Sequence, residues 1–299
     1  MTKRIGNNES PLPRGECYPP LRPSRERNII MPQNITKLIN HARKLRDFVL
    51  DFIFPIECLS CGREGLWLCE KCFRRLNFSQ AQYCLRCGKE NKFGEFCYEC
   101  GTDYSLDGVW VAGNYEEEII AGLIKKFKYN LIKDIGDYLG KFLILFMRDL
   151  INRNRISSAD LTEGLDYRKF EQTAEYSNIL FNFSQNIIMP VPLHRKRKLW
   201  RGFNQAEIMA TIIADYFNAE LFLDKLVRIK QSRPQAKLNK SKRQRNINGC
   251  FAWRGGNLRG RNIILMDDVA TTGSTLNECA KVLKENGAGK VWGLVVANG

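Results

Sequence analysis

Two adjacent carboxylates, Asp267 and Asp268, follow a run of apolar residues in the segment NIILMDDVATTGSTL, which spans residues 262–276. In open α/β sheets, ligands bind beyond the carboxyl ends of the strands. A loop and a helix-like stretch come next, and the free N–H groups at the start of a helix suit a phosphate. The segment therefore predicts carboxylates that grip hydroxyls or a metal ion beside a loop that holds a phosphate. A ribose 5-phosphate carries these groups.

The loop after the pair consists of small and hydroxyl-bearing residues. Gly273 permits close approach of the backbone to a ligand, and four neighbours offer hydroxyl donors. These neighbours are Thr271, Thr272, Ser274 and Thr275. The simpler interpretation is an Asp pair that ends a strand and a Ser or Thr that caps a helix. It accounts for one acid and one hydroxyl but not for the whole segment, so we favour a binding site.

Eight of the eleven cysteines form four C-x-x-C pairs. The pairs are Cys58 with Cys61, Cys69 with Cys72, Cys84 with Cys87, and Cys97 with Cys100. Two intervening residues let one tight turn direct both thiolates at one metal ion, with Zn–S distances of ~2.3 Å. Four pairs satisfy two Cys₄ sites and leave no position for a catalytic water, so structural zinc is predicted rather than redox chemistry. The spacing permits both sequential and interleaved pairing.

The residues around these pairs add two expectations. Gly62, Gly88 and Gly101 each follow a pair, where the turn often requires a positive φ. The other three cysteines are interpreted as ordinary small side chains. They are Cys17, Cys250 and Cys279.

The net charge of +15 is concentrated in one quarter of the chain. Residues 189–261 hold 17 Lys or Arg against 4 Asp or Glu. Such an excess favours a phosphate-rich small molecule or nucleic acid as partner, and a solvated basic surface accounts for the charge equally well. Trp200 and Trp253 interleave with the charges and suit base stacking. Phe203 and Phe251 are better explained as core residues.

Strands and helices alternate along most of the chain, which predicts an α/β fold with a mostly parallel sheet. Strands are expected at 106–115, 187–191, 226–229, 249–253, 262–267 and 290–296, and helices at 116–129, 132–151, 204–217 and 274–286. No stretch has the eighteen consecutive apolar residues of a membrane span. The basic start is not followed by an apolar run and cleavage site. A cytoplasmic protein is therefore expected.

Composition divides the chain into four parts. Residues 1–34 hold six of the ten prolines and are expected to be a disordered tail. An amphipathic helix is expected over 35–55, and the double zinc module over 56–104. The α/β domain is expected over 105–299, with a polar insertion or long loop at 152–185.

The stretch ILMDDVATTGSTL resembles the phosphoribosyl-diphosphate-binding signature of type I phosphoribosyltransferases. Together with PVPLHRKRKLWRGFNQAEIMA, RPQAKLNKSKRQRNINGCF and the cysteine module, it is similar to the ComF family, also called ComF/GntX. The resemblance covers about residues 45–299. It implies a phosphoribosyltransferase-type parallel sheet preceded by a zinc-ribbon-like module, in proteins that serve natural transformation, the processing of imported single-stranded DNA.

The resemblance also implies roles for individual residues. Asp267 and Asp268 would contact the ribose hydroxyls, directly or through Mg²⁺, and residues 271–275 would hold the 5-phosphate. The implied pyrophosphate loop contains Arg195, Arg201 and Gly202. A mobile loop over the site is implied by QAKLNKSKRQRN, and its matching positions are Gln235, Arg243, Arg245 and Asn246.

The implied activity is binding of phosphoribosyl diphosphate and pentosyl transfer to an acceptor that the residues do not identify. One alternative is an inactive accessory protein that kept the fold and binds single-stranded DNA. Another is a zinc-dependent interaction module. Expected partners are phosphoribosyl diphosphate, single-stranded DNA, and other competence or recombination proteins.

Overall fold

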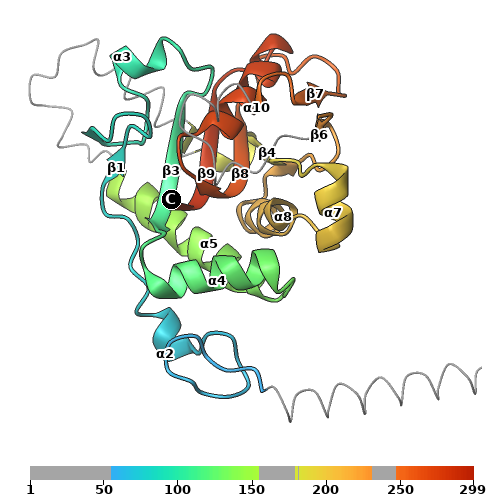
Figure 1. Ribbon diagram of the computed structural model, residues 1–299. Coiled ribbons are helices and arrows are strands. Elements are labelled where there is room, and N and C mark those ends of the chain that lie inside the picture. The colour runs from blue at the N-terminus through green and yellow to red at the C-terminus, as the bar shows by residue number, and fades with distance from the viewer. Residues whose placement is uncertain (1–54, 155–178, 181, 231–246) are drawn as a thin grey trace, which may run out of the picture. The chain divides into compact units, whose positions relative to one another are not determined.

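The computed structural model describes residues 55–154, 179–180, 182–230 and 247–299 (Figure 1). The chain divides into two units, Met1–Pro55 and Ile56–Gly299, and all elements below belong to the second. Apart from Pro55, the tail expected over 1–34 and the helix expected over 35–55 lie outside the described residues, as does the expected mobile loop at 235–246.

Five parallel strands form the central sheet in the order β3-β9-β8-β4-β5. They are β3 (Gly108–Asn114), β4 (Ile187–Pro190), β5 (Glu220–Leu221), β8 (Ile263–Ala270) and β9 (Val291–Asn298). The apolar runs of β8 and β9 are buried, as expected for parallel strands with helices on both faces. The predicted α/β class is confirmed.

Helices cover both faces of this sheet (Figure 1). They are α4 (Glu118–Tyr129), α5 (Ile135–Asn154) and α8 (Gln205–Phe217) on one face, and α10 (Ser274–Glu285) on the other. Because successive strand residues point to opposite faces, Ile264 belongs to the core under α5 and α8, and Leu265 belongs to the core under α10. The chain thus has two apolar cores, one on each side of the sheet.

The two halves of the cysteine module pack mainly in different cores. The first half contains α2 (Glu70–Phe73), whose buried residues pack in the core with α4 and α5. The second half contains the short pair β1 (Gln82–Tyr83) and β2 (Glu90–Asn91), followed by α3 (Tyr98–Gly101). Its buried Cys84, Phe96 and Cys100 pack in the core with α10, whereas its buried Phe93 packs in the core with α4 and α5. The two halves therefore support different parts of the α/β domain.

Two of the expected strands do not join the main sheet. β6 (Leu226–Arg228) and β7 (Phe251–Trp253) pair antiparallel with each other. Antiparallel strands can pair without a crossover helix. This two-stranded ribbon contacts α10 and is separate from the parallel sheet. Phe251 is buried in the core, as expected.

The segment expected to be an insertion at 152–185 contributes to the core at both ends. α5 continues through Asn154, whose buried Nδ2 donates to the carbonyl of Leu150 at 2.9 Å. Ile179, Leu180 and Phe183 are also buried, the last within the short 3₁₀ helix η2 (Phe183–Gln185). At these ends the chain is therefore not an irregular loop: α5 continues through the first end, and the apolar side chains of the second end lie in the core.

No helix in the described ranges combines the length and the apolar character needed to cross a membrane.

Candidate functional site

A cleft of about 430 Å³ lies where β4 ends beside β8. β4 stops at Pro190, opposite Met266, and the chain turns away after Val191 donates to the Met266 carbonyl at 2.8 Å. Asp267 therefore pairs with Val295 of β9 on one side, while its other side opens into the cleft. This is the place where ligands bind in open α/β sheets.

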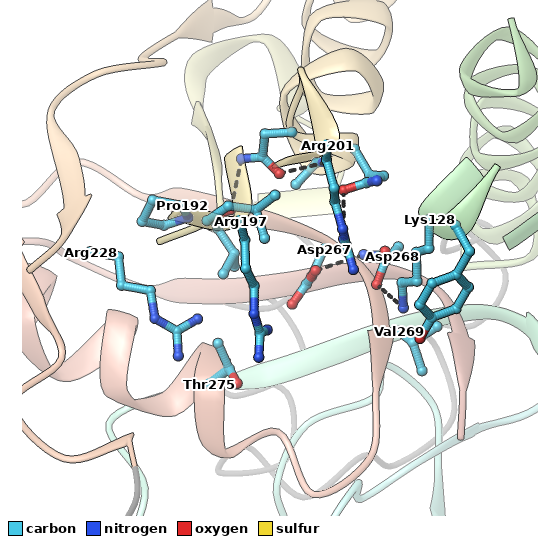
Figure 2. Close-up of a pocket in the computed structure, with 15 residues that line it drawn as sticks. Lys128, Pro192, Arg197, Arg201, Arg228, Asp267, Asp268, Val269 and Thr275 are labelled. Carbon is cyan, nitrogen blue, oxygen red and sulfur yellow. Dashed lines mark hydrogen bonds and ion pairs between the residues drawn. The ribbon is translucent and has the colours of Figure 1, made fainter. Parts of the chain in front are cut away.

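The Asp pair lies within β8. The sequence had predicted that it would lie at the end of this strand. β8 continues to Ala270 because β9 extends equally far and pairs Asn298 with it. Asp267 and Asp268 both line the cleft (Figure 2). Their geometry is linked, because Asp267 Oδ1 accepts from the backbone N–H of Asp268 at 2.9 Å. It is therefore the end of β4, rather than the end of β8, that exposes the pair.

Lys128 is a third charged residue at the Asp pair that the sequence analysis did not identify. Its Nζ lies 2.8 Å from Asp268 Oδ1, and Figure 2 shows the ammonium directed at that carboxylate. Lys128 belongs to the last turn of α4, four residues after buried Ile124. A lysine in line with the buried stripe of an amphipathic helix is the signal that could have identified it.

The charges in the cleft alter one another. Desolvation by the surrounding protein, together with the negative charge of Asp268, raises the pKa of Asp267 to about 7. Desolvation opposes the charge on Lys128, but the carboxylates of Asp268 and Asp267 outweigh it and raise the pKa of that lysine. The ammonium is therefore held in its charged form, while Asp267 can take up a proton near neutral pH.

Three arginines add positive charge to the cleft: Arg197, Arg201 and Arg228. Figure 2 shows Arg201 reaching toward the two carboxylates, and Arg197 and Arg228 directed toward the side where Thr275 lies. Arg201 Nη1 donates to Gln205 Oε1 at 3.0 Å. Burial lowers the pKa of Arg201 and of Arg228. These half-buried cations suit a ligand with several phosphate groups.

The segment expected to be a pyrophosphate loop is largely a helix, α7 (Arg195–Arg201). It begins at His194, whose Nδ1 accepts from the Lys196 N–H at 3.3 Å, and it ends at Gly202 with φ +76°. Helical spacing directs Arg197 and Arg201 into the cleft, whereas Arg195 and Gly202 do not line it. Arg197 therefore lies where the sequence analysis had placed Arg195.

The loop of residues 270–275, called the hydroxyl loop below, joins β8 to α10. Gly273 precedes the helix with φ +68°, a conformation that favours glycine. Thr272 is buried, and its Oγ1 lies 2.7 Å from the Ser274 hydroxyl. Thr275 lines the cleft from the first turn of α10 (Figure 2). Of residues 271–275, Thr275 is the one that lines the cleft together with the Asp pair. Arg243 and Arg245 lie outside the described residues.

The eight paired cysteines form two clusters in sequential order. The first cysteine cluster is Cys58, Cys61, Cys69 and Cys72, and the second cysteine cluster is Cys84, Cys87, Cys97 and Cys100. In each cluster all four sulfurs lie within 4.8 Å of one another. Among the described residues no other group of this kind occurs, and Cys250 and Cys279 are buried in the core.

The geometry of both clusters fits zinc. The sulfurs of Cys61 and Cys69 are 3.7 Å apart, as are those of Cys87 and Cys97. A tetrahedral ion with Zn–S bonds of ~2.3 Å requires sulfurs ~3.8 Å apart. Gly62 and Gly88 have positive φ as expected. Gly101 does not, because it lies in α3. The chain therefore has two four-cysteine sites suited to structural zinc.

Comparison with known proteins agrees with this arrangement. The family described as "Double zinc ribbon domain" matches residues 49–101. Competence protein F of Haemophilus influenzae is 28% identical over 258 residues, which cover 82% of this chain and 98% of that protein. Competence protein ComFC of Bacillus subtilis is 24% identical, over 74% of this chain and 79% of its own length. DNA utilization protein YhgH of Escherichia coli K12 is 33% identical over 104 residues, 35% of this chain and 45% of that protein.

Proposed function

This chain belongs to the ComF family, and we propose that its cleft binds phosphoribosyl diphosphate with Mg²⁺ during the handling of imported DNA. The observation that carries this proposal is one cleft that joins two carboxylates, four cations and the start of α10. A sugar with phosphate groups at both ends requires hydroxyl acceptors in the middle and anion donors on either side.

The order of groups along the cleft matches such a ligand. In Figure 2, Asp267 and Asp268 lie between Lys128 on one side and Arg228 with Thr275 on the other. The 5-phosphate would lie at Thr275, where the first N–H groups of α10 and the helix dipole favour an anion. The diphosphate would lie toward Arg201 and Lys128. The carboxylates would accept hydrogen bonds from the ribose hydroxyls.

Mg²⁺ fits the same donor set. Carboxylate oxygens are its preferred protein ligands, and it commonly binds through one or two of them together with substrate phosphates. Oδ1 of Asp268 already forms an ion pair with Lys128. The carboxylate of Asp267 and the second oxygen of Asp268 are therefore the candidate ligands of Mg²⁺. When bound, the ion would neutralise charge that develops on a departing diphosphate.

The relatives supply the cellular context of the proposal. Two are named as competence proteins and one as a DNA utilization protein. We place this chain in the same context, DNA uptake, with other competence or recombination proteins as partners. Pentosyl transfer would add a chemical step, which is detectable as pyrophosphate release when an acceptor base is supplied.

Calorimetry tests the binding. The protein is titrated with phosphoribosyl diphosphate in the presence and absence of Mg²⁺, then with ribose 5-phosphate alone. We expect Mg²⁺-dependent binding of the diphosphate and weaker binding of the monophosphate. Asp267→Asn should abolish the Mg²⁺ dependence, whereas Asp224→Asn, at a side chain 83% exposed, should not. A wild-type protein that binds neither ligand would rule the proposal out.

Single-stranded DNA binding is a second candidate function, and α7 favours it. The first four residues of α7 are all basic. Leu199 and Trp200 follow them and are 74% and 62% exposed. An exposed tryptophan among cations suits base stacking and phosphate contact. Anisotropy titration of a labelled oligonucleotide tests this: Trp200→Ala should weaken binding, and Tyr98→Ala, at an exposed aromatic on α3, is the matched control. Equal affinity of both variants and the wild type would exclude this surface.

A further inference from the structure

The hydroxyl loop is attached to the second half of the cysteine module. Tyr104 follows α3, and its Oη donates to the backbone carbonyl of Thr272 at 3.2 Å. The two residues are 168 positions apart in sequence. This hydrogen bond holds the backbone of the loop directly, and therefore acts on its conformation rather than on one side chain.

The ring of Tyr104 is itself held by residues that the second cysteine cluster positions. Phe96 precedes Cys97, and its ring centroid lies 4.5 Å from that of Tyr104. Arg86 lies between Cys84 and Cys87, and its guanidinium is 5.6 Å from the ring centroid of Tyr104. Displacement of either turn of the cluster would therefore release the tyrosine that contacts the loop.

Gly273 forms a second contact between the loop and the cluster. A Cβ added at this glycine would lie 2.9 Å from Leu85 Cδ2. Leu85 lies directly after Cys84, in the same turn as Arg86. The loop thus lies close enough to the cluster that a larger residue would displace one or the other.

Asn277 joins the loop's helix to the chain that leaves the cluster. Its Oδ1 accepts from the N–H groups of Ser105 at 2.7 Å and Leu106 at 3.1 Å. Its own N–H donates to the Gly273 carbonyl at 2.8 Å. The start of α10, the loop and the residues after α3 are therefore one hydrogen-bonded unit.

We propose that the second cysteine cluster, through Tyr104, holds the hydroxyl loop in the conformation that receives a phosphate. Zinc at this cluster then sets the affinity of the cleft for a phosphorylated ligand, a consequence that rests on the proposed function. Metal binding and folding are coupled in such small sites, and a preorganised loop binds its ligand without an ordering cost. Tyr104 is a positioning residue in this scheme, since it acts through the loop backbone.

The first cysteine cluster provides a contrast within the same chain. Its neighbours contact α4 and α5: Leu59 packs at Gly122, and Lys141 lies 4.8 Å above the Phe73 ring. The contacts of Tyr104 with Thr272 and of Leu85 with Gly273 both come from the second half of the module. The two clusters are therefore not equivalent with respect to the loop.

Hydrogen exchange on Tyr104→Phe tests the proposal. This variant keeps the ring between Phe96 and Arg86 and removes only the hydroxyl. Tyr98→Phe is the matched control. Tyr98 lies on α3, in the same second half of the cysteine module, and is 91% exposed. Three quantities are measured on the full chain: amide exchange in peptides covering residues 268–277 and 84–100, zinc content, and affinity for phosphoribosyl diphosphate with Mg²⁺.

We expect faster exchange at 268–277 in Tyr104→Phe, with unchanged exchange at 84–100 and unchanged zinc content. Affinity should fall roughly 2- to 10-fold, the effect of one uncharged hydrogen bond. Tyr98→Phe should match the wild type in every measurement. Wild-type exchange at 268–277 in Tyr104→Phe would overturn the proposal.

Partial removal of zinc with a chelator extends the test to the metal. Exchange at 268–277 should rise in step with exchange at 84–100 as zinc is lost, and it should recover when zinc is restored. Exchange at 268–277 that stays constant while the 84–100 peptide opens would overturn the role of zinc. If the wild type does not bind phosphoribosyl diphosphate, the proposed function fails, while the exchange comparison still decides whether the cluster holds the loop.

Discussion

Lys128 and Asp268 form an ion pair, with Nζ and Oδ1 2.8 Å apart, between the last turn of α4 and the middle of the cleft. Both side chains are largely enclosed, at 21% and 10% exposure. The pair places one fixed positive charge beside two carboxylates before any ligand arrives. Burial and the neighbouring carboxylate of Asp268 raise the pKa of Asp267 to about 7, so Asp267 changes its charge near neutral pH.

The first prediction follows from this ion pair. Asp268→Asn should lower the free energy of unfolding by about 3 kcal/mol, because it leaves the enclosed ammonium of Lys128 without its carboxylate. The double variant Asp268→Asn with Lys128→Met should recover part of that loss, since the ammonium and its partner carboxylate are removed together. Urea denaturation of the wild type, the single variants and the double variant measures this coupling. Additive effects of the two single changes would show that the pair contributes nothing.

The second prediction concerns pH and Asp267. The pKa of about 7 lies above the ordinary value of 3.8, so the folded protein retains a proton that the unfolded chain has lost. This contribution to stability is fully present below pH 4 and is lost as the pH rises to about 7. Asp267→Asn should flatten this part of the stability profile between about pH 4 and 7. Denaturant unfolding at a series of pH values checks it.

The same titration should appear in ligand binding, because Mg²⁺ requires the ionised carboxylate. Affinity for phosphoribosyl diphosphate with Mg²⁺ should rise between pH 6 and 8, and binding at pH 6.5 should release protons. Calorimetry in two buffers of different ionisation enthalpy measures that release. The ligand's own phosphate titrates near pH ~6, so Asp267→Asn is the necessary comparison. Equal proton release in both proteins would assign the effect to the ligand.

The third prediction concerns zinc content. The protein purified without added metal should contain about two zinc ions per chain, one for each four-cysteine cluster. Cys61→Ser and Cys87→Ser, both at exposed positions, should each lose one. Cys279→Ala, at a buried cysteine outside both clusters, should retain two. Elemental analysis decides, and a wild-type zinc content near zero would contradict the prediction.

The fourth prediction separates DNA binding from the cleft. Arg195 and Lys196 are exposed on α7 and do not line the cleft. Changing both to Ala should weaken binding of single-stranded DNA and lower the slope of log K against log salt by about 1.4, the value for two phosphate contacts. Affinity for phosphoribosyl diphosphate should not change. Lys281→Ala, at an exposed lysine on α10, is the control, and an unchanged slope in the double variant would exclude α7 as the contact.

Local sequence was sufficient for those features that depend on neighbouring residues. The C-x-x-C turns identify the eight candidate ligands because two intervening residues suffice to direct two thiolates at one ion. The run before Asp267 predicts a buried strand, and the sequence from Thr271 to Thr275 predicts the start of a helix. The alternation of such segments is enough for the α/β class.

The features that sequence did not reveal depend on contacts between distant segments. Spacing permits two pairings of the cysteines, and only the folded chain brings Cys61 next to Cys69 and Cys87 next to Cys97. The Asp pair lies within β8 because β9 continues beside it. The helix α7 directs Arg197 into the cleft rather than Arg195.

Two contacts at the site join residues far apart in the chain: Lys128 with Asp268, and Tyr104 with Thr272. Neither belongs to a local motif, because a charge or a hydroxyl acquires its partner only when the sheet brings separate segments together. Sequence by itself thus determined the fold class and the chemical groups available. The tertiary structure decided which of those groups share a cleft, since burial, pKa and hydrogen bonding all depend on what lies across the space between elements.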